Sequence, residues 1–193
     1  MNNQTLKIVI PMGGYGARLR PHTWSRPKQL IRMAGKTVLD HVLDTFSTLP
    51  DSTDLEYIFI VGKMGEKIEA HMQAFHPECK VHYVEQSEMR GQSHAIYLAR
   101  HLLNGPMLMV FADTLVETNL SFLAHESADA VAWVKAVPDP RRFGVAEVGK
   151  DGWVKRLIEK PTELDNNLVV VGFYYFKESS ALIAAIEEQM RRE

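Results

Sequence analysis

A glycine-rich turn followed by cations is the feature of this sequence that could do chemistry. The segment PMGGYGARLRPHTWSRPK (11–28) contains Gly13, Gly14, Gly16, Arg18 and Lys28. Glycines have no Cβ atom, so their backbone can take positive φ values and approach a ligand closely. Successive amide groups in such a turn bind anions, and arginine and lysine side chains bind phosphate as a planar fork and a point charge. The segment therefore predicts a phosphate-binding loop.

Two well-known phosphate motifs do not fit this loop. A dinucleotide fingerprint that starts at Gly14 requires a glycine at its sixth position, where the sequence has Leu19. A P-loop requires Gly-Lys-Ser/Thr after its first glycine, and no such run follows. Residues 1–39 hold seven basic residues and no acidic one. Their charge is compatible with either an anion-binding surface or an ordinary solvated basic face.

Other side chains offer fewer ways to do chemistry. Asp113 ends the apolar run PMLMVFAD (106–113), where it is either a helix cap or a partial ligand for Mg²⁺, which prefers one or two carboxylates together with phosphate oxygens. The eight histidines show no His-x-x-x-His spacing, so we interpret each as structural or exposed. Cys79 is the only cysteine, which excludes an internal disulfide and a multi-cysteine metal site.

Strand and helix patterns alternate through the first half of the chain. Short apolar runs predict strands, and apolar residues at helical spacing predict helices, the first of them capped by Thr37. The expected strands are 6–10, 55–62, 80–86 and 106–113, and the expected helices after the first are 64–75 and 94–103. Such alternation predicts an α/β fold with a doubly wound, mostly parallel, Rossmann-like sheet.

The alternation of strand and helix patterns stops near residue 129. Four strand-like segments then follow one another through turns such as KDG (150–152), which predicts added antiparallel strands in the second half. A final helix runs to residue 193 without a glycine or proline stop. We therefore expect one domain, 1–193, whose parts 1–128 and 129–193 differ in architecture.

Composition narrows the class of protein further. The 193 residues are 46% apolar and 24% charged, with a formal net charge of −2. This balance gives no general attraction to nucleic acid, and no apolar run reaches the roughly 18–20 residues of a membrane span. The amino terminus lacks the pattern of an export signal. A cytoplasmic protein without nucleic-acid or membrane partners is the simplest interpretation.

The loop resembles the signature of the sugar nucleotidylyltransferases. That signature reads Gly-Gly-x-Gly-Thr-Arg-Leu, then Pro, Thr and Pro-Lys, and this chain has GGYGARLRPHTWSRPKQL. The family includes glucose-1-phosphate thymidylyltransferases and related uridylyltransferases. Further motifs follow in the expected order over essentially all 193 residues. The resemblance implies that residues 1–128 bind the nucleotide and that 129–193 begin a sugar-binding part.

The resemblance also implies roles for individual residues. EQSEMRGQSHAI (85–96) resembles the base-reading segment, so Gln86 would bond the pyrimidine edge and the backbone at Gly91 would approach the base. Asp113 would be the family's metal-binding aspartate. RFGVAEVGKDGWVKRLIEKP (142–161) and NNLVVVGFYYF (166–176) resemble the sugar segments. These segments would contribute Gly144, Glu159, Lys160 and Val171, although by composition Glu-Lys-Pro is also a common surface strand end.

The implied reaction is attack by a sugar 1-phosphate on the α-phosphorus of dTTP or UTP, with glucose 1-phosphate as the family's usual sugar. Arg18 would stabilise the leaving pyrophosphate, Lys28 the triphosphate and Lys160 the incoming phosphate, with Mg²⁺ as cofactor. The family's second metal-binding aspartate lies beyond 166–176, and the chain ends before that position. We therefore expect an amino-terminal part of the enzyme, whose exposed apolar surface would favour a homo-oligomer.

The sequence also departs from the family pattern. Pro11-Met12 precedes the glycines, Ala17 replaces a threonine, and the later turn reads Gly91-Gln92-Ser93. Three alternatives remain open at this point. The first is a non-catalytic nucleotide-sugar-binding or regulatory subunit. The second is a glycosyltransferase, although the sequence has no Asp-x-Asp metal pair. The third is an oxidoreductase, although the loop does not match the dinucleotide fingerprint.

Overall fold

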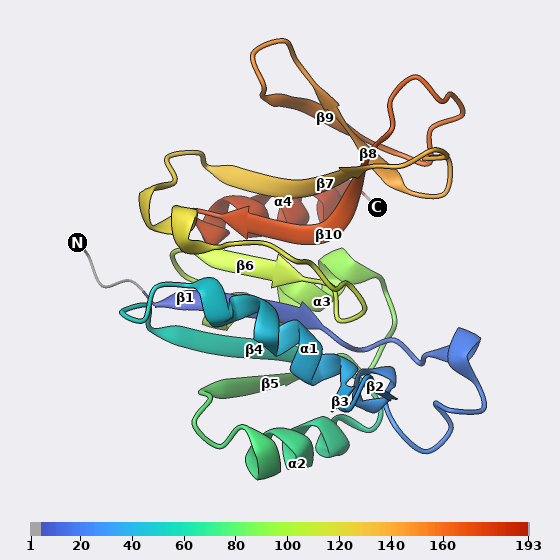
Figure 1. Cartoon of the computed structure of the whole chain (residues 1–193), viewed down its shortest axis with the longest axis vertical. Helices are drawn as coiled ribbons and strands as arrows, with labels where there is room; N and C mark the ends of the chain where they lie inside the picture. The colour runs from blue at the N-terminus through green and yellow to red at the C-terminus, as the bar shows by residue number, and fades with distance from the viewer. Residues whose placement is uncertain (1–4, 193) are drawn as a thin grey trace.

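The fold is built on one eight-stranded sheet with helices on both faces (Figure 1). The computed structural model describes residues 5–192 of the chain. The sheet runs in the order β5-β4-β1-β6-β10-β8-β9, with β7 also paired to β10. The doubly wound α/β fold expected from the sequence is thereby confirmed.

Four parallel strands form the first half of the sheet. They are β1 (Leu6–Pro11), β4 (Leu55–Val61), β5 (Val81–Glu85) and β6 (Met107–Val110). β1 pairs with β4 on one side and β6 on the other, and β4 pairs with β5. The two central strands β1 and β6 are almost wholly buried and, apart from Lys7, apolar, as expected for strands covered on both faces.

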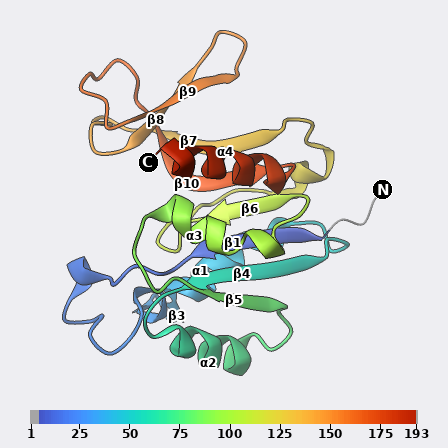
Figure 2. The ribbon, with the colours of Figure 1, turned by 180° about the vertical axis from the view of Figure 1, so that it is seen from behind.

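The helices cover the two faces in pairs. The helices are α1 (Val38–Asp44), α2 (Gly65–Phe75), α3 (Gln92–Leu98) and α4 (Ser179–Arg192). α1 and α2 pack with Ile8, Ile10 and Phe59 in one core cluster. α3 and α4 pack with Val9 and Ile58 in a second cluster on the opposite face, which Figure 2 shows from in front. Successive residues of each strand thus supply opposite faces.

The second half of the chain extends the same sheet with antiparallel strands, as expected. They are β7 (Ala130–Ala136), β8 (Gly144–Val148), β9 (Val154–Glu159) and β10 (Leu168–Phe176). β10 pairs with β6 and also with β7, so it joins the two halves of the sheet. β8 and β9 form a hairpin at the far end of the molecule (Figure 1).

Short elements complete the description. They are the hairpin β2 (Arg32–Met33) and β3 (Lys36–Thr37), and the 3₁₀ turns η1 (Ala17–Leu19), η2 (Lys28–Leu30), η3 (Thr45–Thr48), η4 (Arg100–Leu102) and η5 (Ser121–His125). Thr37 caps α1 as expected, because its hydroxyl accepts the amide of Asp40 and the Asp40 carboxylate accepts the amide of Thr37.

One helix is shorter than the sequence suggested. The apolar pattern predicted a helix over 94–103, whereas α3 begins at Gln92 and ends at Leu98, and η4 follows it. The guanidinium of Arg100 donates a hydrogen bond to the carbonyl of Tyr97 and lies over the Tyr97 ring. This hydrogen bond provides a partner for one carbonyl group in the last turn of α3, where the α-helix ends. Among the helices described, none has the length and apolar character needed to cross a membrane.

Candidate nucleotide-binding site

The segments singled out in the sequence meet at the carboxyl ends of the parallel strands. The glycine loop follows β1, Gln86 follows β5, and Asp113 follows β6 after two residues. Parallel strands end at the same edge of a sheet, and ligands of open α/β folds bind at that edge. The topology therefore brings together residues that are up to 100 positions apart in the chain.

A cavity of about 340 Å³ lies at this edge. Six residues expected at the nucleotide site line it, namely Gly13, Gly14, Lys28, Gln86, Gly91 and Asp113. The remaining wall is mostly apolar and includes Met12, Met89, Ala95 and Phe111. Apolar walls with a few convergent polar groups are typical of small-molecule sites.

Lys28 and Asp113 form an ion pair across the mouth of this cavity. Nζ of Lys28 lies 2.6 Å from Oδ2 of Asp113, and the two side chains are 23% and 62% exposed. The cation expected to hold a triphosphate and the carboxylate expected to hold a metal thus neutralise each other in this structure. Because the pair is partly exposed, it contributes little to stability, and ligand binding can separate the two groups at small cost.

Gln86 is held rigidly at the base of the cavity. Its side chain is buried, Nε2 donates to the carbonyl of Gly91 at 3.1 Å, and its backbone amide donates to the carbonyl of Val61. A Cβ atom on Gly13 would lie only 2.6 Å from Oε1 of Gln86. The Gln86 carboxamide therefore packs directly against the glycine loop, and its orientation is fixed by both neighbours.

The outer part of the glycine loop lies beyond the cavity. Gly16 has a φ of +60°, and its carbonyl accepts the Thr23 hydroxyl at 2.8 Å. Buried Gln29 supports the inner end of the loop by donating to the carbonyl of Met12 at 3.4 Å. Among the residues described, 5–192, Gly16 and Arg18 do not line the cavity, and Arg18 is exposed. Arg18 therefore requires a movement of η1 to reach a ligand there.

Sequence reasoning missed Gly62, which supports the same loop from below. A Cβ atom on Gly62 would lie 2.5 Å from the carbonyl oxygen and 3.0 Å from the Cα of Gly13. Two backbone segments can approach this closely only where one residue has no side chain. The signal available in the sequence was a glycine at the end of the strand pattern LEYIFIVG (55–62).

Replacing Gly62 by alanine is expected to destabilise the protein by about 1–3 kcal/mol, the usual cost of overpacking, because the clash is with backbone that cannot rotate away. At this chain length each kcal/mol lowers Tm by about 2–4 °C. Differential scanning calorimetry measures the effect. Gly14→Ala is the matched control, since a Cβ atom there has no neighbour within 4 Å. Equal Tm values for the two variants would contradict the role of Gly62.

A second cavity, of about 670 Å³, adjoins the first. Three residues expected at the sugar site line it, namely Gly144, Glu159 and Val171. Gln92 and Phe111 line both cavities and form the partition between them. Within residues 5–192, Lys160 lines neither of these two cavities, and its Nζ lies 3.6 Å from Oε1 of Glu159.

The cavity at the strand ends offers part of a ligand set that suits Mg²⁺. Asp113 offers a hard carboxylate oxygen beside space for a phosphate, and its side chain is the more exposed member of the pair with Lys28. Mg²⁺ keeps several waters and takes one or two carboxylates plus substrate phosphates. A single aspartate at this position therefore fits a metal that arrives with its nucleotide.

An open α/β sheet with a glycine loop, a lysine and a carboxylate around one cavity at its carboxyl edge is an arrangement suited to a phosphorylated ligand. Comparison with known proteins specifies the class of protein. The chain belongs to the nucleotidyl transferase family, whose model matches residues 7–193.

Relatives and solved structures agree with this assignment. The chain is 32% identical over 177 residues to the bifunctional protein GlmU of Methanococcus maripaludis, covering 90% of this chain and 41% of that protein. It is 31% identical over 195 residues to a glucose-1-phosphate thymidylyltransferase of Streptomyces griseus, covering 97% of this chain and 54% of that one. The chain thus spans about half the length, or less, of these two relatives.

The fold matches that of a UDP-glucose pyrophosphorylase solved with UDP-glucose. The TM-score is 0.78 at 21% identity, and the match covers 96% of this chain and 80% of the other. At this identity the comparison establishes the fold alone. Together with the family match, it confirms the resemblance drawn from the glycine loop and the later motifs.

Proposed function

We propose that the protein transfers a nucleotidyl group from dTTP or UTP to a sugar 1-phosphate, with glucose 1-phosphate as the sugar, giving a nucleoside diphosphate sugar and pyrophosphate. One observation carries the proposal. Six residues that the sequence marks for nucleotide binding line one cavity, and the residues marked for the sugar line a second cavity that shares its wall. Family membership and the names of the relatives support the same reaction.

In this reaction an oxygen of the sugar phosphate attacks the α-phosphorus, forming a new P–O bond while the bond to pyrophosphate breaks. The protein needs to align the two anions and neutralise their charge, because little covalent chemistry falls to its side chains. The shared wall of Gln92 and Phe111 supports this alignment, since ligands in the two cavities would meet there.

We assign the roles by cavity. Gly13, Gly14 and Gly91 would bring backbone close to the nucleotide, and Gln86 would bond the pyrimidine. Lys28 would leave Asp113 for the triphosphate. In the second cavity Gly144, Glu159 and Val171 would contact the sugar. Gly16, Arg18 and Lys160 would act after closure of the segments that carry them.

Asp113 would hold Mg²⁺ together with phosphate oxygens. The metal, when bound, supplies charge neutralisation and orientation of the phosphates. We further propose that residues 1–128 serve the nucleotide and that 129–193 begin the sugar-binding part. The continuous sheet allows both parts to contribute to one reaction, because β10 pairs directly with β6.

Lys28→Met tests the site by binding alone. The variant keeps the length of the side chain and removes its charge, so we expect dTTP and UTP to bind at least about tenfold more weakly, the loss of one hydrogen bond to a charged group. Isothermal titration calorimetry with each nucleotide, with and without Mg²⁺, measures this change and ranks the two bases.

Lys36→Met is the matched control. Lys36 lies in the same basic segment and pairs with Asp44 at 2.7 Å, outside the cavity, so its loss removes the same charge at another place. Similar weakening in both variants would attribute binding to the general field of the basic segment rather than to Lys28. No nucleotide binding by the unaltered protein at millimolar concentration would contradict the proposed site. Binding without any pyrophosphate release, in the protein expressed from its complete gene, would instead support a non-catalytic nucleotide-sugar-binding subunit.

A further inference from the structure

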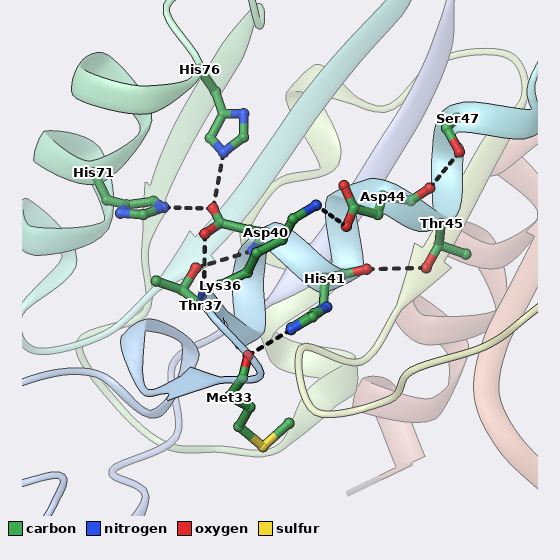
Figure 3. A network of polar contacts seen from close by, with 10 residues as sticks. All are labelled: Met33, Lys36, Thr37, Asp40, His41, Asp44, Thr45, Ser47, His71 and His76. Atoms are coloured by element: carbon green, nitrogen blue, oxygen red, sulfur yellow. Dashed lines mark hydrogen bonds and ion pairs between the residues drawn. The ribbon is translucent and has the colours of Figure 1, made fainter.

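Two histidines and an aspartate converge on the face of the molecule formed by α1 and α2 (Figure 3). Nε2 of His71 lies 2.7 Å from Oδ1 of Asp40, and Nε2 of His76 lies 2.9 Å from the same oxygen. One ligand atom from each of the three residues lies within 4.8 Å of the others. None of the three lines the nucleotide or sugar cavity, so the proposed reaction leaves the cluster unexplained.

The local fold explains why histidines five residues apart can meet. His71 is in the last turns of α2, whereas His76 follows the helix, where its φ of −138° and ψ of 50° turn the chain back. Its backbone amide still donates to the carbonyl of Met72. Because the spacing of the two histidines matches no helical ligand motif, their convergence could not be predicted from the sequence.

Asp40 is held in place by the capping box of α1. Its Oδ2 accepts the amide of Thr37 at 2.9 Å, which leaves Oδ1 directed at both imidazoles (Figure 3). Burial by itself would raise the pKa of the Asp40 carboxyl. Hydrogen bonds from the two imidazoles and from the backbone amide outweigh burial and hold that pKa well below its usual range. The hydrogen bond to the Thr37 amide therefore already orients the carboxylate toward both imidazoles.

We infer that Asp40, His71 and His76 form a site for a transition-metal dication, with Zn²⁺ the best match. Two imidazole nitrogens and one carboxylate oxygen are a recognised three-ligand set for Zn²⁺, with water as the fourth ligand. Imidazole ligands distinguish this site from the all-oxygen environment that Mg²⁺ prefers. The inference does not depend on the proposed nucleotidyl transfer.

The two distances from the imidazole nitrogens to Oδ1 of Asp40 require only a small adjustment, and the two nitrogens lie within 4.8 Å of each other. Zn–N and Zn–O bonds of about 2.0–2.1 Å place tetrahedral ligand atoms roughly 3.3–3.4 Å apart, about half an ångström more than the hydrogen-bond distances here. Metal binding moves each imidazole proton to Nδ1. A carboxylate oxygen of Glu78 lies 3.9 Å from Nδ1 of His76. From there it can orient the ring, as the outer-shell partners of metal-bound histidines do.

A second group, His76, Glu78 and Cys79, is a weaker candidate. Burial, together with the neighbouring Glu78 carboxylate, raises the pKa of the Cys79 thiol to about 11. Thiols bind metals as thiolates, so this one is unfavourable as a ligand at neutral pH. The Glu78 side chain is also largely exposed. We therefore assign the metal to Asp40, His71 and His76.

Metal binding would cross-link two helices of the fold. The metal would join the first turn of α1 to the end of α2, and α1 directly follows the β2–β3 hairpin and the η2 turn that carries Lys28. A ligand that binds only the folded state stabilises it by mass action. Zn²⁺ is therefore expected to raise Tm without occupying the nucleotide site.

Calorimetric titration with ZnCl₂ in the presence of millimolar Mg²⁺, paired with thermal unfolding, tests the inference. We expect one equivalent of Zn²⁺ to bind with micromolar or tighter affinity and to raise Tm. Mutation of an outer-shell hydrogen-bond partner of a metal ligand typically weakens metal binding about 10- to 100-fold. His71→Gln and His76→Gln each remove a direct ligand, so each is expected to weaken binding by more than that and to abolish the rise in Tm.

Two controls separate this site from adventitious binding. His41→Gln removes an α1 histidine whose ring contacts the carbonyl of Met33 rather than Asp40 (Figure 3), and Cys79→Ser removes the thiol of the second group. Both variants are expected to retain binding. Lack of saturable Zn²⁺ binding by the unaltered protein would overturn the inference without any variant. Loss of binding in Cys79→Ser or His41→Gln, or unchanged binding in His71→Gln and His76→Gln, would also overturn it.

Discussion

Arg18→Ala is expected to slow nucleotidyl transfer by about 10²–10³-fold, the effect of losing one preorganised contact to developing charge, about 2.7–4 kcal/mol. Arg18 follows the glycine loop in η1 and is exposed. A residue that reaches the phosphates only after the loop closes contributes mainly to the transition state. We therefore expect kcat to fall much more than nucleotide affinity. The measurement is pyrophosphate release with glucose 1-phosphate and dTTP or UTP, in the protein expressed from its complete gene.

Arg26→Ala provides the comparison. Arg26 belongs to the same basic segment but lines a separate small hollow with Pro21, His22, Ser25 and Ile31. A similar loss of rate in both variants would mean that the segment acts through its overall charge. Near-normal turnover in Arg18→Ala would remove Arg18 from the mechanism.

Asp113→Asn is expected to abolish the dependence of the reaction on Mg²⁺ and to lower the rate at least about 100-fold, because a neutral amide is a poor replacement for a charged Mg²⁺ ligand. The ion pair with Lys28 at 2.6 Å gives a second, opposite expectation. Without Mg²⁺, the substitution frees Lys28 from its carboxylate, so metal-free nucleotide affinity should stay equal or rise. Calorimetry across Mg²⁺ concentrations separates the two effects.

Asp44→Asn is the matched control for this charge change. Asp44 pairs with Lys36 in the same geometry, 2.7 Å, but outside the cavity. A loss of nucleotide affinity in Asp113→Asn that is the same with and without Mg²⁺ would indicate a structural role for Asp113. An unchanged response to Mg²⁺ would exclude Asp113 as a metal ligand.

The sequence was most informative where structure is local. The period of apolar residues identified the parallel strands and the helices α1 and α2, and Thr37 as a cap located the start of α1. Local signals also marked the change to antiparallel strands after residue 129. These features depend on neighbours in the chain, so the chain itself encodes them.

Contacts between distant segments could not be predicted in this way. The pairing of β10 with β6, the ion pair between Lys28 and Asp113, and the approach of Gly62 to Gly13 all join residues far apart in sequence. No local period encodes which strands become neighbours. The likeness to a known family supplied the candidate residues of the site, and the fold supplied their proximity.

The pairing of β10 with β6 also bears on whether the first half of the chain could exist alone. All four residues of β6 are buried, with exposures of 8% or less, and both of its faces are apolar. A chain divided near residue 128 would leave β6 as an uncovered edge strand with free amide and carbonyl groups. Such strands pair with other copies and promote aggregation. Residues 129–192 therefore also protect the first half of the chain from self-association.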